Sequence, residues 1–495
     1  MTDTSEAAPS PGRTFFGHPR GLSTLFLTEM WERFSYYGMR ALLAVYLAAP
    51  VSEGGLGFPE NTAIAIFSVY LSMVYLLTLP GGWVSDRFLG PRKSVTIACV
   101  IIMVGHFLLA VPTEGFFFAG LLFVAIGSGL VKANISTMVG HLYVGALEWR
   151  RDSAFTIFYM GINLGAFFAP LVIGTIGQKV GYHLGFAVAG VGMAIGLVQY
   201  LVGLPSLSPH SDVVPAPMDA EHRAALVKKG LLWLLAPVVF YLVVGLSGHY
   251  TIDWVVVPLT VIGLVFPAWT LIRIRRDPEL TPPERQRMTA YVWLFVAAAI
   301  FWMIYDQGGS TLNIFADRDT DTEFAGIDFP SSWFQSLNPL FIMALGPVFA
   351  WLWQWLARRH KEPSTPAKFA VGLILVGLSF AVFLPALTAA ADGSLVSPMW
   401  LVAIYLVQTV GELCVSPVGL SVTTKLAPEK YGSQMMGVWF LAVTAGDCVT
   451  SLASLAGADL NGRPFVVAEV VVAVLVGALI LLFRKRISRM FVGHH

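Results

Sequence analysis

Residues 28–40 read Thr-Glu-Met-Trp-Glu-Arg-Phe-Ser-Tyr-Tyr-Gly-Met-Arg, and they place two carboxylates and two guanidinium groups inside an apolar run. At helical spacing these polar side chains share one stripe, which consists of Glu29, Glu32, Arg33, Tyr36, Tyr37 and Arg40. A charge at the centre of a bilayer costs about 2.5–3.5 kcal/mol or more, so such residues face a bundle interior or a water-filled cavity. The stripe therefore indicates either a functional site in a membrane protein or a structural cluster of ion pairs.

The composition of the whole chain also indicates a membrane protein. Of its 495 residues, 56% are hydrophobic and only 12% are charged, whereas soluble domains carry about 25% charged residues. The net charge of +1 gives no sign of a nucleic-acid partner. Cys99, Cys414 and Cys448 lie in apolar runs without metal-ligand spacing, so we expect buried thiols and no metal site.

Apolar runs long enough to cross a bilayer occur in groups of six, two and six along the chain. The predicted fold is an all-α polytopic membrane protein with about 14 transmembrane helices. A cytoplasmic tail (1–20) precedes an N-terminal six-helix bundle (21–203) and a cytoplasmic linker (204–228). An inserted two-helix hairpin (229–273), a C-terminal six-helix bundle (288–484) and a second cytoplasmic tail (485–495) follow.

The basic residues predict which side of the membrane each loop occupies. If the N-terminus is cytoplasmic, all Lys and Arg between the apolar runs face the cytoplasm except Lys179, Arg318 and Arg463, in agreement with the positive-inside rule. The longest loop on the opposite side, 316–330, is acidic. We therefore expect both termini in the cytoplasm and two bundles of the same orientation, related by an axis along the membrane normal.

Other apolar runs also carry polar groups that lipid could not solvate. Lys132 is one helical turn from Ser128 and Ser136, and more than two turns of apolar residues separate it from either end of its run. With the two inserted runs left out of the count, the further candidates at helical spacing are Tyr159 and Asn163 in the fifth run, Trp302, Asp306, Ser310 and Asn313 in the seventh, and Gln408, Glu412 and Ser416 in the tenth. Because an unpaired buried charge is costly, we expect the cations of the first half to pair with Asp306 and Glu412 of the second.

Several motifs resemble those of the proton-coupled oligopeptide transporters, a family of the major facilitator superfamily. The loop GGWVSDRFLGPRK at 81–93 is similar to the cytoplasmic signature of the superfamily, and EMWERFSYYG at 29–38 resembles the E-x-x-E-R-F-x-Y-Y-G motif of the family. Further matches are FYMGINLG at 158–165, FWMIYDQ at 301–307, WFQSLNP at 333–339 and GEL at 411–413. The resemblance implies the major facilitator fold, and the order of six, two and six helices is that of bacterial members.

The resemblance implies a symporter, not an enzyme, that carries di- and tripeptides inward with protons by alternating access. It implies a monomer in the lipid bilayer of a bacterial inner membrane, with the proton as coupling ion and no cofactor. Arg33 and Lys132 match the cations that receive the peptide carboxylate, and Glu412 matches the acid that receives the amine. The other peptide-binding positions are the amides Asn163 and Asn338 and the aromatic residues Tyr36, Tyr37, Tyr75, Trp302 and Trp439.

Proton coupling and gating are implied in the same way. The proton-coupling positions are Glu29, Glu32, Arg33, Asp306 and Glu412, and the gating positions are Arg40, Asp306 and Lys132. Asp306 stands where the family usually has glutamate. Because aspartate is one methylene shorter, we expect it to need water or a helix movement to reach Arg40.

The residues alone leave other functions open. An intramembrane enzyme would need a nucleophile with a base or a metal cluster, and the chain has no H-E-x-x-H or G-x-S-x-G motif. A receptor or channel would not explain acids and bases divided between the two halves. A carrier of nitrate or another organic anion is the alternative within the family, although such carriers often lack the two acids of the E-x-x-E-R motif. Peptide preference, proton number and the role of the inserted hairpin are not determined by the sequence.

Overall fold

The computed structural model describes residues 14–324 and 326–491, and nearly all of this part is helical. The N-terminal bundle consists of α1 (Arg20–Ala48), α2 (Glu60–Leu76) with α3 (Thr78–Val84), α4 (Pro91–Leu109), α5 (Glu114–His141), α6 (Arg151–Ala169) with α7 (Thr175–Lys179), and α8 (Tyr182–Gly203). The inserted pair is α9 (Ala220–Leu246) and α10 (Asp253–Arg275). The C-terminal bundle consists of α11 (Pro282–Tyr305), α12 (Thr311–Arg318), α13 (Leu337–Arg358), α14 (Thr365–Ala390), α15 (Met399–Leu426), α16 (Gly432–Leu455) and α17 (Arg463–Arg489).

Thirteen helical segments of the described chain are long and apolar enough to cross a membrane. The helix α1 is not among them, because its middle carries Glu29, Glu32, Arg33 and Arg40. It is nevertheless 29 residues long and packs between α6 and α8, so its charges are shielded by protein. With α1 included, the all-α architecture of about 14 transmembrane helices predicted from the sequence is confirmed.

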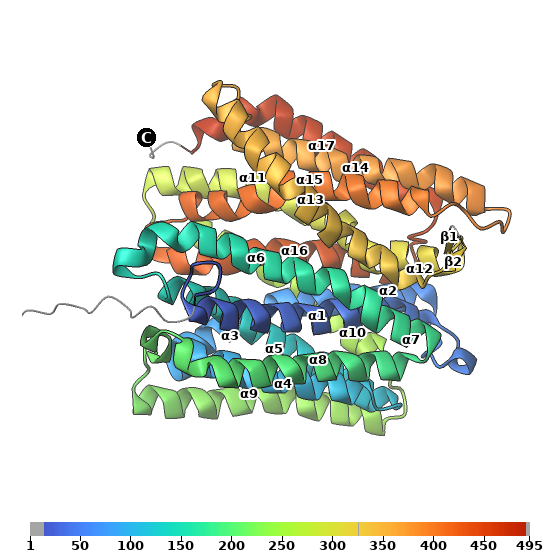
Figure 1. The fold of residues 1–495 in the computed structure, drawn as a ribbon, viewed down its shortest axis with the longest axis horizontal. Helices are drawn as coiled ribbons and strands as arrows, with labels where there is room; N and C mark the ends of the chain where they lie inside the picture. Colours follow the sequence, from blue (N-terminus) through green and yellow to red (C-terminus); the bar gives the residue numbers. More distant parts are fainter. Residues whose placement is uncertain (1–13, 325, 492–495) are drawn as a thin grey trace, which may run out of the picture.

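The helices run between two ends of the molecule (Figure 1). The described chain begins and finishes at one end, which we call the terminal end. The strands β1 (Glu323–Phe324) and β2 (Ile327–Asp328) form an antiparallel hairpin at the other, the hairpin end. The predicted acidic loop 316–330 therefore lies opposite the described termini.

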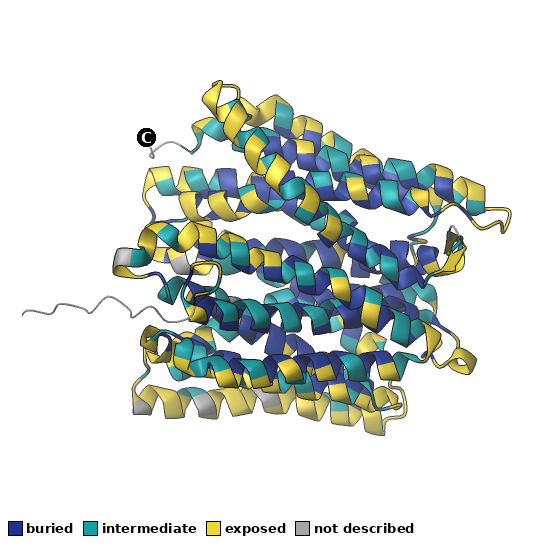
Figure 2. Cartoon of the chain, viewed as in Figure 1, coloured by how far each residue is buried: buried dark blue, intermediate teal, exposed yellow. Residues whose placement is uncertain are grey.

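Of the two inserted helices, only α9 lies at the edge of the molecule (Figure 1). The helix α10 packs against α2 and α16, so it contacts both bundles. The helix α9 lies farther out and is exposed along most of its length (Figures 1 and 2). It begins at Ala220, where Asp219 caps it by accepting a hydrogen bond of 2.8 Å from the His222 amide. Residues 220–228, assigned to the linker from the sequence, are therefore the first turns of this helix.

The seventh apolar run differs from the single helix expected over 288–314. It begins earlier than expected, at Pro282, after a capping box in which Thr281 and Glu284 bond each other's backbone amides. It then breaks at a tight turn over Asp306–Gly309, and Ser310 has φ −120° and ψ −86° before α12 begins. Asp306 thus lies at the end of α11 and not in the middle of a continuous helix.

A polar cluster fixes the inserted hairpin to the C-terminal bundle at the terminal end. Asp277, which follows α10, accepts hydrogen bonds from Lys430 Nζ at 2.8 Å and from the Tyr431 hydroxyl at 2.5 Å. Lys430 also donates to Glu279 at 2.8 Å. The hydrogen bonds from Lys430 and Tyr431 hold the pKa of Asp277 well below its usual value of 3.8.

We predict that Asp277→Asn lowers the unfolding temperature of the detergent-solubilised protein at about pH 7. The folded-state pKa of Asp277 lies below 3.8, so its stabilising effect is complete above about pH 5 and is lost as the pH falls through the folded-state value. The difference between wild type and variant should therefore shrink in acid. Glu279→Gln is the control, because the Glu279 side chain is 72% exposed. Equal unfolding temperatures of wild type and Asp277→Asn near neutral pH would contradict the prediction.

Candidate functional site

A cavity of about 270 Å³ lies between the two bundles, slightly below the range of about 300–1,000 Å³ typical of small-molecule sites. Both bundles contribute to its wall, through α1, α2 and α6 on one side and α11, α13, α15 and α16 on the other. The residues predicted from the sequence that line it are Tyr37, Arg40, Tyr75, Asn163, Trp302, Asp306, Asn338, Glu412 and Trp439.

Five further predicted residues lie beside the cavity without lining it: Glu29, Glu32, Arg33, Tyr36 and Lys132. Arg33 Nε contacts Glu29 Oε1 at 2.8 Å and Glu32 Oε2 at 2.7 Å, and all three side chains are at least 94% buried. Ser128 on α5 donates to Glu32 Oε1 at 3.2 Å. One guanidinium group thus serves two carboxylates, so full ionisation would leave this cluster with a net negative charge.

The position of Arg33 depends on close packing between α1 and α6. A Cβ atom at Gly165 would lie 2.2 Å from the Met30 carbonyl oxygen and 3.1 Å from the Arg33 Cβ. Only glycine fits there, so this position of the FYMGINLG motif allows α6 to approach α1. The close approach holds Asn163, on the preceding half-turn, at the cavity wall.

Lys132 has no carboxylate within ion-pair distance in the described part of the chain. Its Nζ instead lies 3.8 Å from the centroid of the Tyr75 ring and 5.6 Å from that of Tyr36. A desolvated cation over an aromatic face is stabilised by about 2 kcal/mol, less than a carboxylate would provide. The expected ion pair between Lys132 and the second half is therefore wrong for this conformation, because Tyr75 occupies the contact position.

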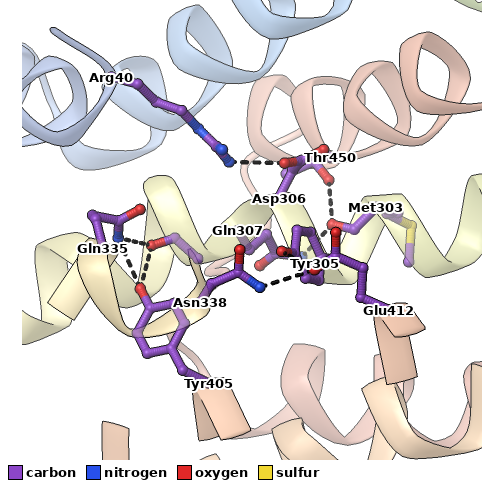
Figure 3. Close-up of polar contacts among 11 residues, drawn as sticks. Arg40, Met303, Tyr305, Asp306, Gln307, Gln335, Asn338, Tyr405, Glu412 and Thr450 are labelled. Atoms are coloured by element: carbon purple, nitrogen blue, oxygen red, sulfur yellow. Dashed lines mark hydrogen bonds and ion pairs between the residues drawn. The ribbon is translucent and has the colours of Figure 1, made fainter. Parts of the chain in front are cut away.

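Glu412 is bonded by neutral groups and not by a cation (Figure 3). Its Oε2 accepts hydrogen bonds from the Tyr305 hydroxyl at 2.7 Å and from Asn338 Nδ2 at 2.9 Å. Asn338 also donates to Thr409 at 3.1 Å, which fixes the orientation of its amide. The predicted ion pair of Glu412 with the first half is thus also wrong here, and an acid of the cavity wall lacks a positive partner.

The one cross-half pair that forms as predicted among these candidates joins Arg40 to Asp306 (Figure 3). Arg40 Nη2 lies 2.8 Å from Asp306 Oδ1, so the expectation that aspartate is too short to reach Arg40 without water or helix movement is wrong. The break after Asp306 supplies the missing reach, because the turn directs the end of α11 toward α1.

Three residues not singled out from the sequence lie at or near that turn, and two of them hold it in place. The Tyr405 hydroxyl donates to the Gly308 carbonyl at 2.7 Å, and Gln335 Nε2 donates to the same carbonyl at 2.5 Å and to Tyr405 at 2.8 Å. These contacts satisfy a carbonyl that the broken helix leaves without its usual partner. Tyr305, the third residue, bonds Glu412. Their positions beside recognised motif residues were the only available signal.

Two acids were missed despite an available signal. Asp447 on α16 and Glu469 on α17 are 2% and 3% exposed, and both lie within apolar runs. The rule that drew attention to Glu29 applies to them equally. Unlike Glu29, neither acid belongs to a row of charged residues at helical spacing, and the sequence analysis therefore did not select them.

Contacts between the bundles close the hairpin end. Arg318 Nη1 pairs with Glu60 at 2.5 Å and Lys179 Nζ with Asp328 at 2.9 Å. Hydrogen bonds across the same end join Gln178 to Asp317 at 2.8 Å, Trp333 to Thr175 at 2.8 Å and Asn313 to the Ala41 carbonyl at 2.8 Å. At the terminal end of the described chain, none of the ion pairs joins one bundle to the other: Arg92–Asp212 joins the N-terminal bundle to the linker, Lys430 joins the C-terminal bundle to Asp277 and Glu279 beside the inserted hairpin, and His222–Asp219 and Lys368–Glu362 are local.

Comparison with known proteins gives the chain a family context. The family model described as PTR2, POT family, matches residues 92–457. The uncharacterized transporter YclF of Bacillus subtilis (strain 168) is 44% identical over 444 residues, which cover 89% of this chain and 88% of the relative. A di-/tripeptide transporter of Lactococcus lactis subsp. cremoris is 40% identical over 488 residues, which cover 97% of each chain.

A solved structure has the same fold. The crystal structure of peptide transporter POT in complex with sulfate matches with a TM-score of 0.93 and 41% sequence identity, over 98% of each chain. The match therefore includes both bundles and the inserted hairpin, and it confirms the predicted fold of the major facilitator type.

We predict that Asp306→Asn weakens closure of the hairpin end. The substitution leaves the Arg40 guanidinium buried without its carboxylate, at a cost of roughly 3–5 kcal/mol to the closed arrangement. Spin-label distances between the hairpin ends of α1 and α12 should lengthen and broaden. Asp306→Glu keeps the charge and serves as the matched control, for which we expect wild-type distances. Identical distance distributions for wild type and Asp306→Asn would show that the pair does not hold the bundles together.

Proposed function

The chain belongs to the POT family, and from this membership and the charges around its cavity we propose that it imports di- and tripeptides together with protons by alternating access. The Lactococcus relative named a di-/tripeptide transporter matches almost the full length of both chains. The protein is accordingly a secondary transporter and not an enzyme. A rocking of two bundles around a midplane site is the movement that this architecture permits.

The observation that carries the proposal is the pair of unmatched charges at the cavity. Glu412 on the wall has only neutral hydrogen-bond donors, and Lys132 lies behind Tyr75 without a carboxylate. A zwitterionic peptide carries one ammonium and one carboxylate group, and it would satisfy both ends at once. Burying either protein charge without a partner is costly, so the site favours a ligand of this charge pattern.

The remaining wall suits ligands whose side chains vary. Aromatic rings of Tyr37, Trp302 and Trp439 provide apolar surface, and the amides of Asn163 and Asn338 provide both donors and acceptors. We assign the backbone of the peptide to the amides and its side chains to the aromatic wall. The cavity of about 270 Å³ is closed at the hairpin end, and its size is that of a small peptide.

We assign proton coupling to the Arg33 cluster, with Asp306 and Glu412 as further acids. In this structure Arg33 holds Glu29 and Glu32. A peptide carboxylate that attracts Arg33 and Lys132 would weaken these contacts, and an acid deprived of its cation in a low-dielectric site binds a proton. Each proton that moves inward gains about 2.3 kcal/mol per 100 mV of membrane potential.

We place the terminal end in the cytoplasm of a bacterial inner membrane. The loops at that end carry most of the basic residues, which supports this orientation. The described conformation is then inward-facing, because the hairpin end is closed by Arg40–Asp306, Arg318–Glu60 and Lys179–Asp328. The transporter acts as a monomer in the lipid bilayer, with the proton as its coupling ion and no cofactor.

The first test of this function is uptake of a radiolabelled dipeptide by proteoliposomes. We expect accumulation above the external concentration only with an inward proton gradient. Glu29→Gln or Glu32→Gln should abolish this accumulation, yet peptide exchange down its gradient should persist, because the amide resembles a protonated acid. Gradient-driven accumulation by both variants would remove these acids from coupling. Uptake of nitrate instead of peptide by the wild type would overturn the substrate assignment.

A second test concerns the two ends of the peptide. Glu412→Gln removes a charged hydrogen bond worth about 1.5–3 kcal/mol, which corresponds to a roughly 10- to 150-fold loss of affinity for a free-amine dipeptide. At the wild-type protein, an N-acetylated dipeptide should compete poorly for uptake of the radiolabelled dipeptide. At Glu412→Gln, it should compete as well as the free-amine dipeptide does. A dipeptide ester, which lacks the free carboxylate, is the control. Glu412→Gln should still prefer the free peptide over the ester, whereas Lys132→Ala should lose this preference. Equal competition by acetylated and free peptides at the wild-type protein would contradict the assignment of Glu412.

A further inference from the structure

Two buried acids have no role in the site described above. Asp447 and Glu469 are 2% and 3% exposed, and Asp447 Oδ2 and Glu469 Oε2 each lack a hydrogen-bond partner. Glu469 Oε1 accepts a hydrogen bond of 2.5 Å from Gln307 Nε2. Neither acid has a cation within ion-pair distance in the part of the chain that the structure describes. An ionised carboxylate without a cation is poorly tolerated at such depth.

Packing of α16 places Asp447 beside the Arg40–Asp306 pair. Thr450, one turn further on, donates to the Met303 carbonyl at 3.2 Å, and Met303 is one turn before Asp306 on α11 (Figure 3). On the preceding position, a Cβ at Gly446 would lie 2.8 Å from the Met303 nitrogen. The two helices therefore approach closely at Gly446, the residue before Asp447, and this approach lies one turn before Asp306 on α11.

The helices α2, α10 and α11 pack against this part of α16. From α2, Ser72 accepts through its carbonyl from Thr444 at 3.2 Å and contacts Cys448 at 3.0 Å. From α10, Thr260 bonds Ser451 at 2.8 Å, and from α11 the contacts are to Met303. The charged groups that act on Asp447 are Asp306 and Arg40. The Tyr70 hydroxyl on α2 is buried and unpaired.

We propose that Asp447 is a second proton-binding carboxyl of the Arg40–Asp306 gate, an inference that rests on the proposed proton-coupled function. Arg33 contacts both Glu29 and Glu32, whereas Arg40 pairs with Asp306 and leaves Asp447 beside the pair without a contact to the guanidinium group. When the gate closes, Arg40 pairs with Asp306, and Asp447 is enclosed beside a carboxylate without a cation of its own. It binds a proton at that step and releases it when the gate opens to water.

The direction of the pH effect follows from this arrangement. The closed gate binds one more proton than the open gate, so acid favours closure and alkali favours opening. Asp447→Asn has no proton to gain or lose and imitates the protonated acid. Its gate should therefore stay closed at neutral pH, and its closure should lose the dependence on pH that Asp447 supplies.

The test combines spin-label distances across α1 and α12 with infrared spectroscopy, so neither readout requires transport. For wild type we expect the closed fraction to rise between about pH 8 and pH 5, and a protonated-carboxyl band that shifts when aspartate alone is labelled with carbon-13. Asp447→Asn should lose that band and flatten the pH profile, whereas Asp447→Glu should keep the profile. Glu469→Gln is the matched control, a carboxyl equally buried but bonded to Gln307, and it should keep both.

Each outcome decides for or against the proposal. A pH profile of Asp447→Asn equal to that of wild type would overturn it. If Asp447→Asn does not fold, absence of the aspartate-dependent band in wild type at the closed gate overturns it equally. Failure of the proposed transport function can be distinguished from failure of the Asp447 proposal, because it would appear as a lack of proton-driven dipeptide uptake by the wild-type protein. With uptake intact, we expect Asp447→Asn to leave the number of protons moved per peptide unchanged, because a proton that Asp447 binds as the gate closes returns to the same side when the gate opens.

Discussion

The structure depends on a shortage of positive charge in its interior. Three cations, Arg33, Arg40 and Lys132, are set among more acids than they can pair with in one arrangement. In a low-dielectric interior every unmatched acid must find a proton, a neutral donor or a ligand. This constraint couples the Arg33 cluster, the cavity acid Glu412 and the gate. When one carboxylate gains a cation, the remaining carboxylates need another partner.

The broken seventh span shows how backbone geometry serves that system. The glycines after Asp306 permit a turn, and Tyr405 and Gln335 bond the carbonyl that the turn exposes. The result is a carboxylate at a helix end that can reach across to α1. A continuous helix would have kept a side chain of this length on its own half, and the two bundles would have lost a contact that depends on charge.

The two halves of the cavity differ in how their charges are held. On the first half, carboxylates restrain Arg33 and an aromatic ring restrains Lys132. On the second, a hydroxyl and an amide hold Glu412 in place without neutralising it. The neutral donors fix the position of Glu412 while leaving its charge for the ligand.

The sequence by itself determined the class of protein, the approximate number of spans and the charged residues of the cavity wall, because apolar run length and isolated intramembrane charges are local properties of the chain. The motif at 29–38 also located the Arg33 cluster, whose members are neighbours on one helix. The ion pairs and contacts between the two bundles could not be predicted in this way. Whether Arg40 meets Asp306, whether Lys132 meets an acid or the Tyr75 ring, and where Asp447 lies depend on the turn at Asp306–Gly309 and on how α16 packs against α11. Those contacts join residues far apart in the chain, so only the tertiary structure could decide them.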